Sequence, residues 1–157
     1  MTNPVSVKDT NPKDAIGTSK VPLHLLSPIA KAHWACAQFA GMVKYGAWNW
    51  RAAGIRASVY IAAIQRHVDG IISGEEFDPV DNTRHEGNIM SCAAIMLDAK
   101  AAGLYIDDRP PMVNHRPTYA EVEAAMVEIK KRYAEMFPHH YTIHDTASIQ
   151  AKRATTK

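Results

Sequence analysis

The chain has 157 residues, of which 46% are hydrophobic and 22% are charged, and its formal net charge is +2. This length fits one domain that buries a core without disulfides or a structural zinc ion. A net charge this small argues against nucleic acid as a partner, because nucleic-acid-binding domains usually carry a strong basic patch. We therefore expect a single globular domain over residues 1–157.

Three further features bear on location. Cys36 and Cys92 have no CxxC partner, which excludes a zinc knuckle and fits a reducing compartment. Residues 1–14 lack the apolar stretch of a signal peptide. No run of the sequence is apolar over the length needed to span a bilayer. We therefore expect a cytoplasmic protein with no membrane partner.

The first third of the chain is predicted to hold an arm, a helix and a loop. Residues 1–20 are polar and rich in Asn, Asp, Lys and Pro, which favours an irregular arm. Ser27 followed by proline is typical of a helix N-cap and first turn, and predicts a helix over residues 28–45. The segment 46–54, with its two tryptophans, is expected to be a loop.

Two more helices are predicted in the middle of the chain. Apolar residues recur at the helical period from residue 57 or 58 to about 73. The pattern Thr83-Arg84-His85-Glu86 fits a capping box, in which Thr83 is the N-cap of the helix and the Glu86 side chain reaches back to it. This third helix should run to about Ala102, with Asp98 facing solvent.

A fourth helix is predicted from a second capping box, Thr118-Tyr119-Ala120-Glu121, to the residue before Pro138. Its apolar residues step alternately by three and four, which makes a narrow stripe suited to packing on another helix. The stripe consists of Tyr119, Val122, Met126, Ile129, Tyr133 and Met136. An exposed stripe of this kind favours a homo-oligomer.

No segment shows the alternation of a strand, so the predicted fold class is all-α. We expect a four-helix bundle over residues 21–137, between an irregular arm at 1–20 and a polar C-terminal tail at 138–157.

An acidic turn follows the second predicted helix. Gly74 and Pro79 keep this segment out of helix. Like charges this close repel one another unless a cation lies among them, and a hard divalent cation bound through oxygen is the natural solution. A solvated acidic turn that binds nothing explains the same pattern. The four acids are Glu75, Glu76, Asp78 and Asp81.

Histidines flank this turn. His67 shares a helix face with Ile64 and Ile71, and His85 lies in the first turn of the next helix, with Asn88 one turn further on. A helix–turn–helix hairpin would bring both histidines and Asn88 to the acidic turn. A histidine on an apolar face is more often a hydrogen-bonded core residue than a ligand, so both interpretations stay open.

A second cluster combines cations, flat rings and one amide in the segment Lys44-Tyr45-Gly46-Ala47-Trp48-Asn49-Trp50-Arg51. Rings stack on a base, an amide reads its edge, and Lys or Arg pairs with phosphate, so the cluster suits a nucleotide. The alternative is that the tryptophans fill the end of the bundle. Arg66, next to His67, offers either a phosphate partner or a surface salt bridge.

Taken in order, several short motifs resemble one family. The motifs are Asn11-Pro12-Lys13-Asp14-Ala15-Ile16-Gly17, Lys20-Val21-Pro22-Leu23, Lys44-Tyr45-Gly46, Asn49-Trp50-Arg51, Arg66-His67, Gly74-Glu75, Asp78-Pro79 and His85. The series is similar to the phage and bacterial dATP/dGTP diphosphohydrolase family, which includes MazZ-like enzymes and is related to the MazG-like all-α nucleotide pyrophosphohydrolases. The resemblance spans about residues 11–103.

The resemblance implies a helical protein that assembles as a dimer or tetramer and uses Mg²⁺ or Mn²⁺. The implied reaction cleaves a purine deoxynucleoside triphosphate, dGTP or dATP, to the monophosphate and pyrophosphate, a step that serves 2-aminoadenine DNA synthesis in some phages. The catalytic residues would be Glu75, Glu76, Asp78 and His67. The metal ligands would be Glu75, Asp78, Asp81 and His85. The substrate would be bound by Lys13, Lys44, Asn49, Trp50, Arg51, Arg66 and Asn88.

The chain departs from the family pattern in its ligands. MazG-like proteins carry metal on paired helical E-x-x-E and E-x-x-D motifs, whereas Glu75-x-x-Asp78 lies in a turn. Asn88 stands where many relatives have a second histidine, and Val80-Asp81-Asn82 stands where relatives have Glu-Ser-Gly. A non-catalytic helical module that binds RNA or a phage protein is therefore the alternative hypothesis, supported also by the basic residues Lys152, Arg153 and Lys157.

Overall fold

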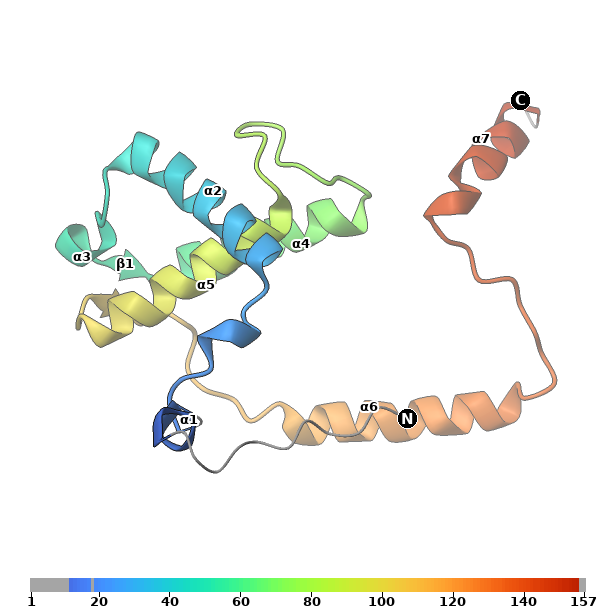
Figure 1. Cartoon of the computed structure of the whole chain (residues 1–157). Helices are drawn as coiled ribbons and strands as arrows, with labels where there is room; N and C mark the ends of the chain where they lie inside the picture. The colour runs from blue at the N-terminus through green and yellow to red at the C-terminus, as the bar shows by residue number, and fades with distance from the viewer. Residues whose placement is uncertain (1–11, 18, 156–157) are drawn as a thin grey trace. The chain divides into compact units, whose positions relative to one another are not determined.

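The computed structural model describes residues 12–17 and 19–155 (Figure 1). The chain divides into two compact units, residues 1–107 and 108–157. Both units are mostly helical, which confirms the predicted helical character. No helix within the described ranges is long and apolar enough to cross a membrane.

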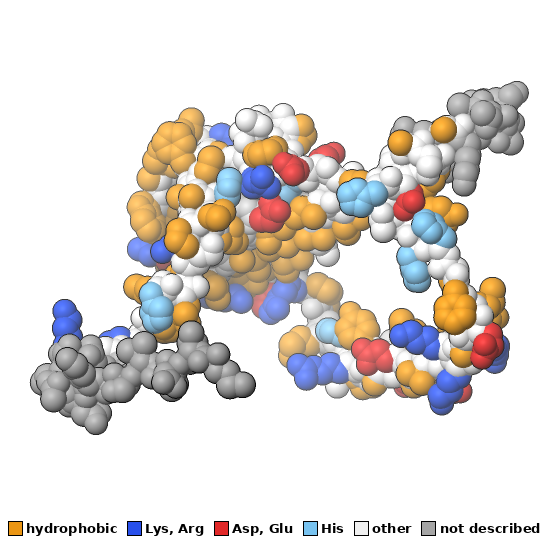
Figure 2. Space-filling model, turned by 45° about the vertical axis from the view of Figure 1, so that its right-hand side comes forward, with side chains coloured by type: hydrophobic (Ala, Val, Ile, Leu, Met, Phe, Trp, Pro, Cys, Tyr) orange, Lys and Arg blue, Asp and Glu red, His pale blue; other side chains and the backbone are white. Residues whose placement is uncertain are grey.

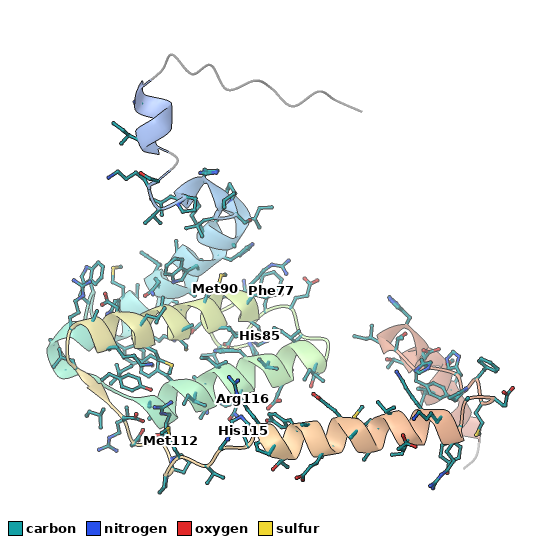
Figure 3. The ribbon with its side chains drawn as sticks, turned by 90° about the horizontal axis from the view of Figure 1, so that it is seen from below. Phe77, His85, Met90, Met112, His115 and Arg116 are labelled. Carbon is teal, nitrogen blue, oxygen red and sulfur yellow. The ribbon has the colours of Figure 1, made fainter. Side chains whose placement is uncertain are left out.

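Three helices form the body of the first unit: α2 (Pro28–Tyr45), α4 (Ala57–Ile72) and α5 (His85–Ala101). Helix α5 packs along both α2 and α4 (Figures 1 and 3). The predicted start of α2 is confirmed, because the Ser27 side chain accepts a hydrogen bond from the Ala30 N–H at 3.3 Å. The helix ends at Tyr45 and is followed by Gly46, which has a φ of 88° that favours glycine.

Close packing of α2 on α5 depends on Gly87. A Cβ atom at this position would lie 2.5 Å from the carbonyl oxygen of His33, so any larger residue would push the two helices apart. The buried hydrophobic residues among those described are small or medium in size: Ala37, Ile55, Ala57 and Ala99. Many larger apolar side chains of these helices are open to solvent, among them Phe39 and Val43 of α2.

Short elements tie the helix ends together. Helix α3 (Trp50–Ala53) occupies part of the segment predicted to be a loop. Strand β1 (Ile55–Arg56) pairs in parallel with β2 (Tyr105–Ile106), although no strand was predicted. Two-residue strands are too short to show alternation in a sequence, which is why they were not predicted. Their pairing links the start of α4 to the segment after α5.

The predicted capping box at Thr83 is wrong. Helix α5 begins at His85 with Arg84 as its N-cap, and no side chain caps it. Thr83 is buried, and its hydroxyl exchanges hydrogen bonds with the Asn88 side chain at 2.9 and 3.1 Å. The threonine therefore closes the preceding loop against the helix instead of capping it.

The second unit contains α6 (Arg116–Arg132), a short 3₁₀ segment (Ile143–Asp145) and α7 (Thr146–Thr155). The capping box predicted at Thr118 is also wrong, because α6 starts two residues earlier, with a proline in its first turn. Helix α6 ends at Arg132, more than one turn before the predicted end at Phe137.

The N-terminal arm contains a helix, α1 (Pro12–Gly17), where an irregular segment was predicted, and a 3₁₀ turn follows at Leu23–Leu25. Residues 1–11 and 18 of the predicted arm lie outside the described residues. The fourth helix of the expected bundle, α6, belongs to the second unit. The four-helix bundle, the single domain with its core at 21–137, and the homo-oligomer stay predictions.

Candidate metal centre and nucleotide cavity

Three side chains that can bind a metal meet where the α4–α5 loop closes on the two helices. They are His67 of α4, Asp78 of the loop and His85, the first residue of α5, and one ligand atom from each lies within 4.8 Å of the others. His85 is labelled in Figure 3. Nδ1 of His67 lies 3.0 Å from Nδ1 of His85 and 3.8 Å from Oδ2 of Asp78. Two imidazoles and one carboxylate are a common donor set for a divalent transition metal.

The loop itself orients Asp78. Its Oδ1 accepts the backbone N–H groups of Val80 at 2.8 Å and Asp81 at 3.1 Å, while its own N–H donates to the Thr83 carbonyl at 2.8 Å. Asn82, with a φ of 52°, completes the turn. Burial alone would raise the pKa of Asp78, but the two N–H groups and His67 hold it below its usual value. Oδ2 is therefore an ionised oxygen directed toward His67.

His67 is suited to bind a cation as a neutral ring. Burial is the main cause that lowers the pKa of His67, His85 adds to the effect, and Asp78 opposes it. A neutral imidazole is the form that binds metal. Nε2 of His85 is buried and has no hydrogen-bond partner in the described part of the chain. Because metal–nitrogen bonds are about 2.1 Å long, ring nitrogens 3.0 Å apart can share one ion, and the donor set fits.

Gly70 makes room for the His85 ring. A Cβ atom at Gly70 would lie 2.8 Å from Nε2 of His85 and 3.3 Å from Oε2 of Glu75. The Gly70 carbonyl also accepts the Glu75 N–H at 3.0 Å, which fixes the start of the acidic turn. This glycine was not singled out from the sequence, because nothing local to α4 shows what approaches it.

The four acids of the turn have different neighbours. Oε2 of Glu75 lies 3.5 Å from Nε2 of His85, although the Glu75 side chain is 54% exposed. Glu76 lies 3.6 Å from Arg84, which stacks over Phe77. Asp81 forms an ion pair with Lys44 of α2. The structure therefore brings Asp78 into the histidine cluster, places Glu75 beside it, and pairs the other two acids with cations.

A cavity of about 490 Å³ opens beside this cluster, between α2, α4 and α5, and His67 and Asp78 form part of its wall. Most of the predicted substrate-binding residues line it: Lys44, Asn49, Trp50, Arg66 and Asn88. Tyr60 also lines it and was missed in the sequence, where it is one of several apolar-face residues of α4. Burial raises the pKa of the Tyr60 hydroxyl, so this group is protonated and can donate a hydrogen bond.

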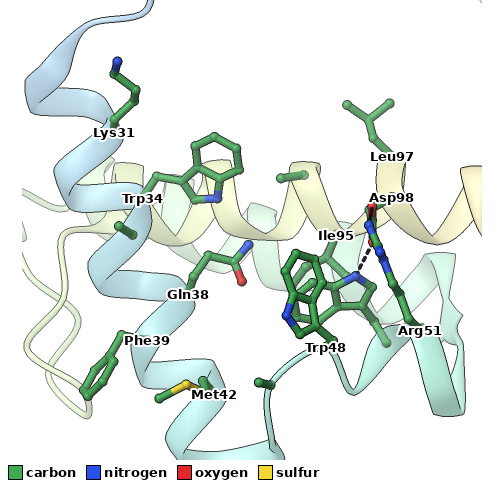
Figure 4. Close-up of a pocket in the computed structure, with 14 residues that line it drawn as sticks. Lys31, Trp34, Gln38, Phe39, Met42, Trp48, Arg51, Ile95, Leu97 and Asp98 are labelled. Atoms are coloured by element: carbon green, nitrogen blue, oxygen red, sulfur yellow. Dashed lines mark hydrogen bonds and ion pairs between the residues drawn. The ribbon is translucent and has the colours of Figure 1, made fainter.

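A second, larger cavity of about 860 Å³ lies between α2, α3 and α5 (Figure 4). Trp34, Phe39 and Trp48 line it, and Arg51 lies 4.6 Å above the Trp48 ring. Arg51 lines this cavity and not the one beside the histidines. Lys13, on α1, lines neither cavity.

Asp98, which was predicted to face solvent, is 28% exposed and is bound by two neighbouring side chains. Arg51 binds it through two nitrogens, at 2.6 and 2.7 Å, and the Trp50 indole N–H donates to it at 2.6 Å. These bonds, that of Arg51 first, lower the pKa of Asp98 to about 2. Asp98 thus anchors α3 to α5 and holds Trp50 at the edge of both cavities. No local signal separates it from an ordinary surface acid.

Residues 10–109 match the family described as dATP/dGTP diphosphohydrolase, N-terminal. The match covers more than half of the chain. The chain belongs to this family. The family name implies a nucleotide substrate and suggests the use of a divalent metal, for which the cluster of His67, Asp78 and His85 is a candidate site. No curated protein and no solved structure matches the chain.

The family match contains both histidines, the acidic turn and the smaller cavity, and ends before α6. The resemblance noted in the sequence is therefore confirmed at the level of the family. The ligand set and the substrate contacts stay predictions.

Proposed function

We propose that this protein is a metal-dependent nucleotide pyrophosphohydrolase that converts dGTP or dATP to the monophosphate and pyrophosphate. The observation that carries this proposal is the position of the His67–Asp78–His85 cluster beside a 490 Å³ cavity, whose wall contains His67 and Asp78 together with basic and aromatic side chains. Cavities of roughly 300–1,000 Å³ suit ligands the size of a nucleotide. The whole arrangement lies within the residues matched to the family.

The proposed metal ligands are His67, Asp78 and His85. A divalent ion held there would offset the charge of the phosphates and make water a stronger nucleophile near neutral pH. Two imidazoles favour Mn²⁺ over Mg²⁺, because Mg²⁺ prefers an all-oxygen shell. Glu75 is our candidate to complete the site or accept the proton of the attacking water, because its carboxylate lies 3.5 Å from His85 and is open to solvent.

The phosphates would be bound by Lys44 and Arg66, which reach the same cavity from α2 and α4. Lys44 would exchange its present partner, Asp81, for a phosphate oxygen. The base would stack on Trp50 or Tyr60, with Asn49 available to read its edge. In contrast to the expectation from sequence, Arg51 would act through Trp50 and Asp98 rather than on the substrate.

In the proposed reaction, a water oxygen attacks the α-phosphorus and the bond from that phosphorus to the α–β bridging oxygen breaks. The water oxygen stays in the monophosphate, the bridging oxygen leaves with pyrophosphate, and one proton passes to a carboxylate and then to solvent. Removal of dGTP or dATP in this way would suit a role in 2-aminoadenine DNA synthesis of a phage.

The direct test is turnover of dGTP, dATP and other nucleoside triphosphates by the purified chain with Mn²⁺ or Mg²⁺. We expect pyrophosphate release and, in ¹⁸O-labelled water, label in the monophosphate. Asp78→Asn should lower kcat/KM at least about 100-fold, because it removes a metal ligand. Asp69→Asn, an exposed acid on the same helix as His67, should leave turnover unchanged.

Absence of pyrophosphate with every nucleotide and both ions would disprove the enzyme proposal and favour a binding module. Normal turnover by Asp78→Asn would disprove the ligand assignment while leaving the activity in place.

A further inference from the structure

Helix α6 carries an apolar stripe that no other described element of its own unit covers. Within this unit Tyr119, Val122, Met126 and Ile129 are 61%, 52%, 58% and 56% exposed. Figure 2 shows hydrophobic side chains open on the visible face of this unit. The helix lies beyond the residues matched to the diphosphohydrolase family. The residues proposed to bind the nucleotide all lie in the other unit.

An isolated helix of this length is only marginally stable in water, and most helices in proteins are stabilised by packing of an apolar face. The stripe has the spacing of a heptad repeat, with three and four residues between successive apolar positions. This spacing fits one other helix better than a flat or irregular surface, because each side chain would enter a space between side chains on the partner helix.

We propose that α6 packs against α6 of a second copy of this chain, in antiparallel orientation. In the register centred on Met126 and Ile129, Met126 packs against Ile129 of the partner subunit. Val122 packs against Tyr133 of the partner subunit, the residue that directly follows the helix. Twofold symmetry repeats both contacts, so the central part of the stripe is covered on both helices. Tyr119 reaches toward the turn that follows the partner's helix.

Charges beside the stripe select this partner and this orientation. Glu123 and Lys130 each follow a stripe residue directly, and neither forms an ion pair within the described residues. In the antiparallel register Glu123 faces Lys130 of the partner subunit, and the pair occurs twice. In a parallel pair they would face the uncharged Thr118 and Ala125 instead. The surface is thus complementary to an inverted copy of itself.

The test is the mass of the full chain in solution, measured by light scattering and sedimentation over a range of concentrations. Met126→Glu places a charge in the centre of the stripe and should halve the mass of the assembly that α6 joins. Val127→Glu is the matched control, because Val127 is 51% exposed and adjacent in sequence but lies off the stripe. This control should keep the wild-type mass.

Charge reversal tests the orientation. Glu123→Lys and Lys130→Glu should each weaken the dimer roughly tenfold, because each creates two like-charge pairs. The double variant should restore the wild-type dissociation constant. A wild-type mass for Met126→Glu would overturn the proposal. A double variant that dimerises more weakly than both single variants would also overturn it. So would a Met126→Glu variant that keeps the wild-type mass but lowers the unfolding temperature of the first unit, because α6 would then pack on its own chain.

Discussion

Nδ1 of His67 lies 3.0 Å from Nδ1 of His85, although the residues are 18 positions apart and belong to different helices. Two ring nitrogens at this distance need a proton or a cation between them. We therefore expect Mn²⁺ to stabilise the folded chain by about 2.7 kcal/mol at a concentration 100 times the dissociation constant. Thermal unfolding with and without Mn²⁺ measures this effect.

His67→Gln should lose most of the Mn²⁺ stabilisation, while His140→Gln, an exposed histidine of the second unit, should keep all of it. Equal stabilisation of the wild type and His67→Gln would show that Mn²⁺ binds elsewhere.

The ion pair of Lys44 with Asp81 leads to a second prediction. The hydrogen bond from Lys44 to Asp81 is the main cause that raises the pKa of the lysine, so Lys44 is charged but occupied. Asp81→Asn should free it for phosphate and lower the KM for dGTP about threefold. Lys44→Met should raise the KM roughly tenfold with little change in kcat. Steady-state kinetics with Mn²⁺ measure both variants.

If Asp81 is instead a metal ligand, as the family resemblance implied, Asp81→Asn will lower kcat at least about 100-fold. The two roles of Asp81 thus predict opposite changes in activity.

Gly70 leads to a third prediction, on the shape of the metal centre. A methyl group at this position would lie 2.8 Å from Nε2 of His85 and must displace the ring. Gly70→Ala should therefore lose the stabilisation by Mn²⁺ and lower turnover at least about tenfold. Thermal unfolding with and without Mn²⁺ measures the stabilisation, and pyrophosphate release measures the turnover.

Gly41→Ala is the control for the effect of alanine on helix stability. Gly41 lies within α2, and a Cβ there would meet nothing within 4 Å. This variant should raise the free energy of unfolding by about 0.5–1 kcal/mol. Unchanged Mn²⁺ stabilisation in Gly70→Ala would show that the His85 ring does not need its observed position.

Asp98 leads to a prediction on pH. Its pKa in the folded chain is about 2, chiefly because Arg51 binds it, whereas an unfolded Asp titrates near ~3.9. A lowered pKa contributes stability that is complete above the unfolded value and is lost as the pH falls toward the folded one. The difference in free energy of unfolding between the wild type and Asp98→Asn should therefore be constant above about pH 5 and should shrink toward pH 2.

Urea unfolding followed by tryptophan fluorescence, at several pH values, measures this difference. Asp69→Asn serves as the control and should show no such change with pH. A difference for Asp98→Asn that persists unchanged at the lowest pH would mean that its cause is not the charge of the carboxylate.

The sequence alone determined where the main helices lie and which family the chain belongs to. Ser27 and the proline after it fixed the start of α2, and the apolar period fixed α4, because both signals act within a few residues. The flanking histidines were placed correctly relative to the turn, since a helical hairpin brings the ends of two consecutive helices together.

Only the tertiary structure decided how the polar side chains of the site pair. Asp81 meets Lys44 across 37 residues, and Asp98 meets Arg51 across 47 residues. Thr83 was predicted to cap α5, but its hydroxyl bonds Asn88 in the folded loop. Such pairs form when packed helices bring distant residues within hydrogen-bond range, and no local pattern in a single sequence records which distant residue that will be.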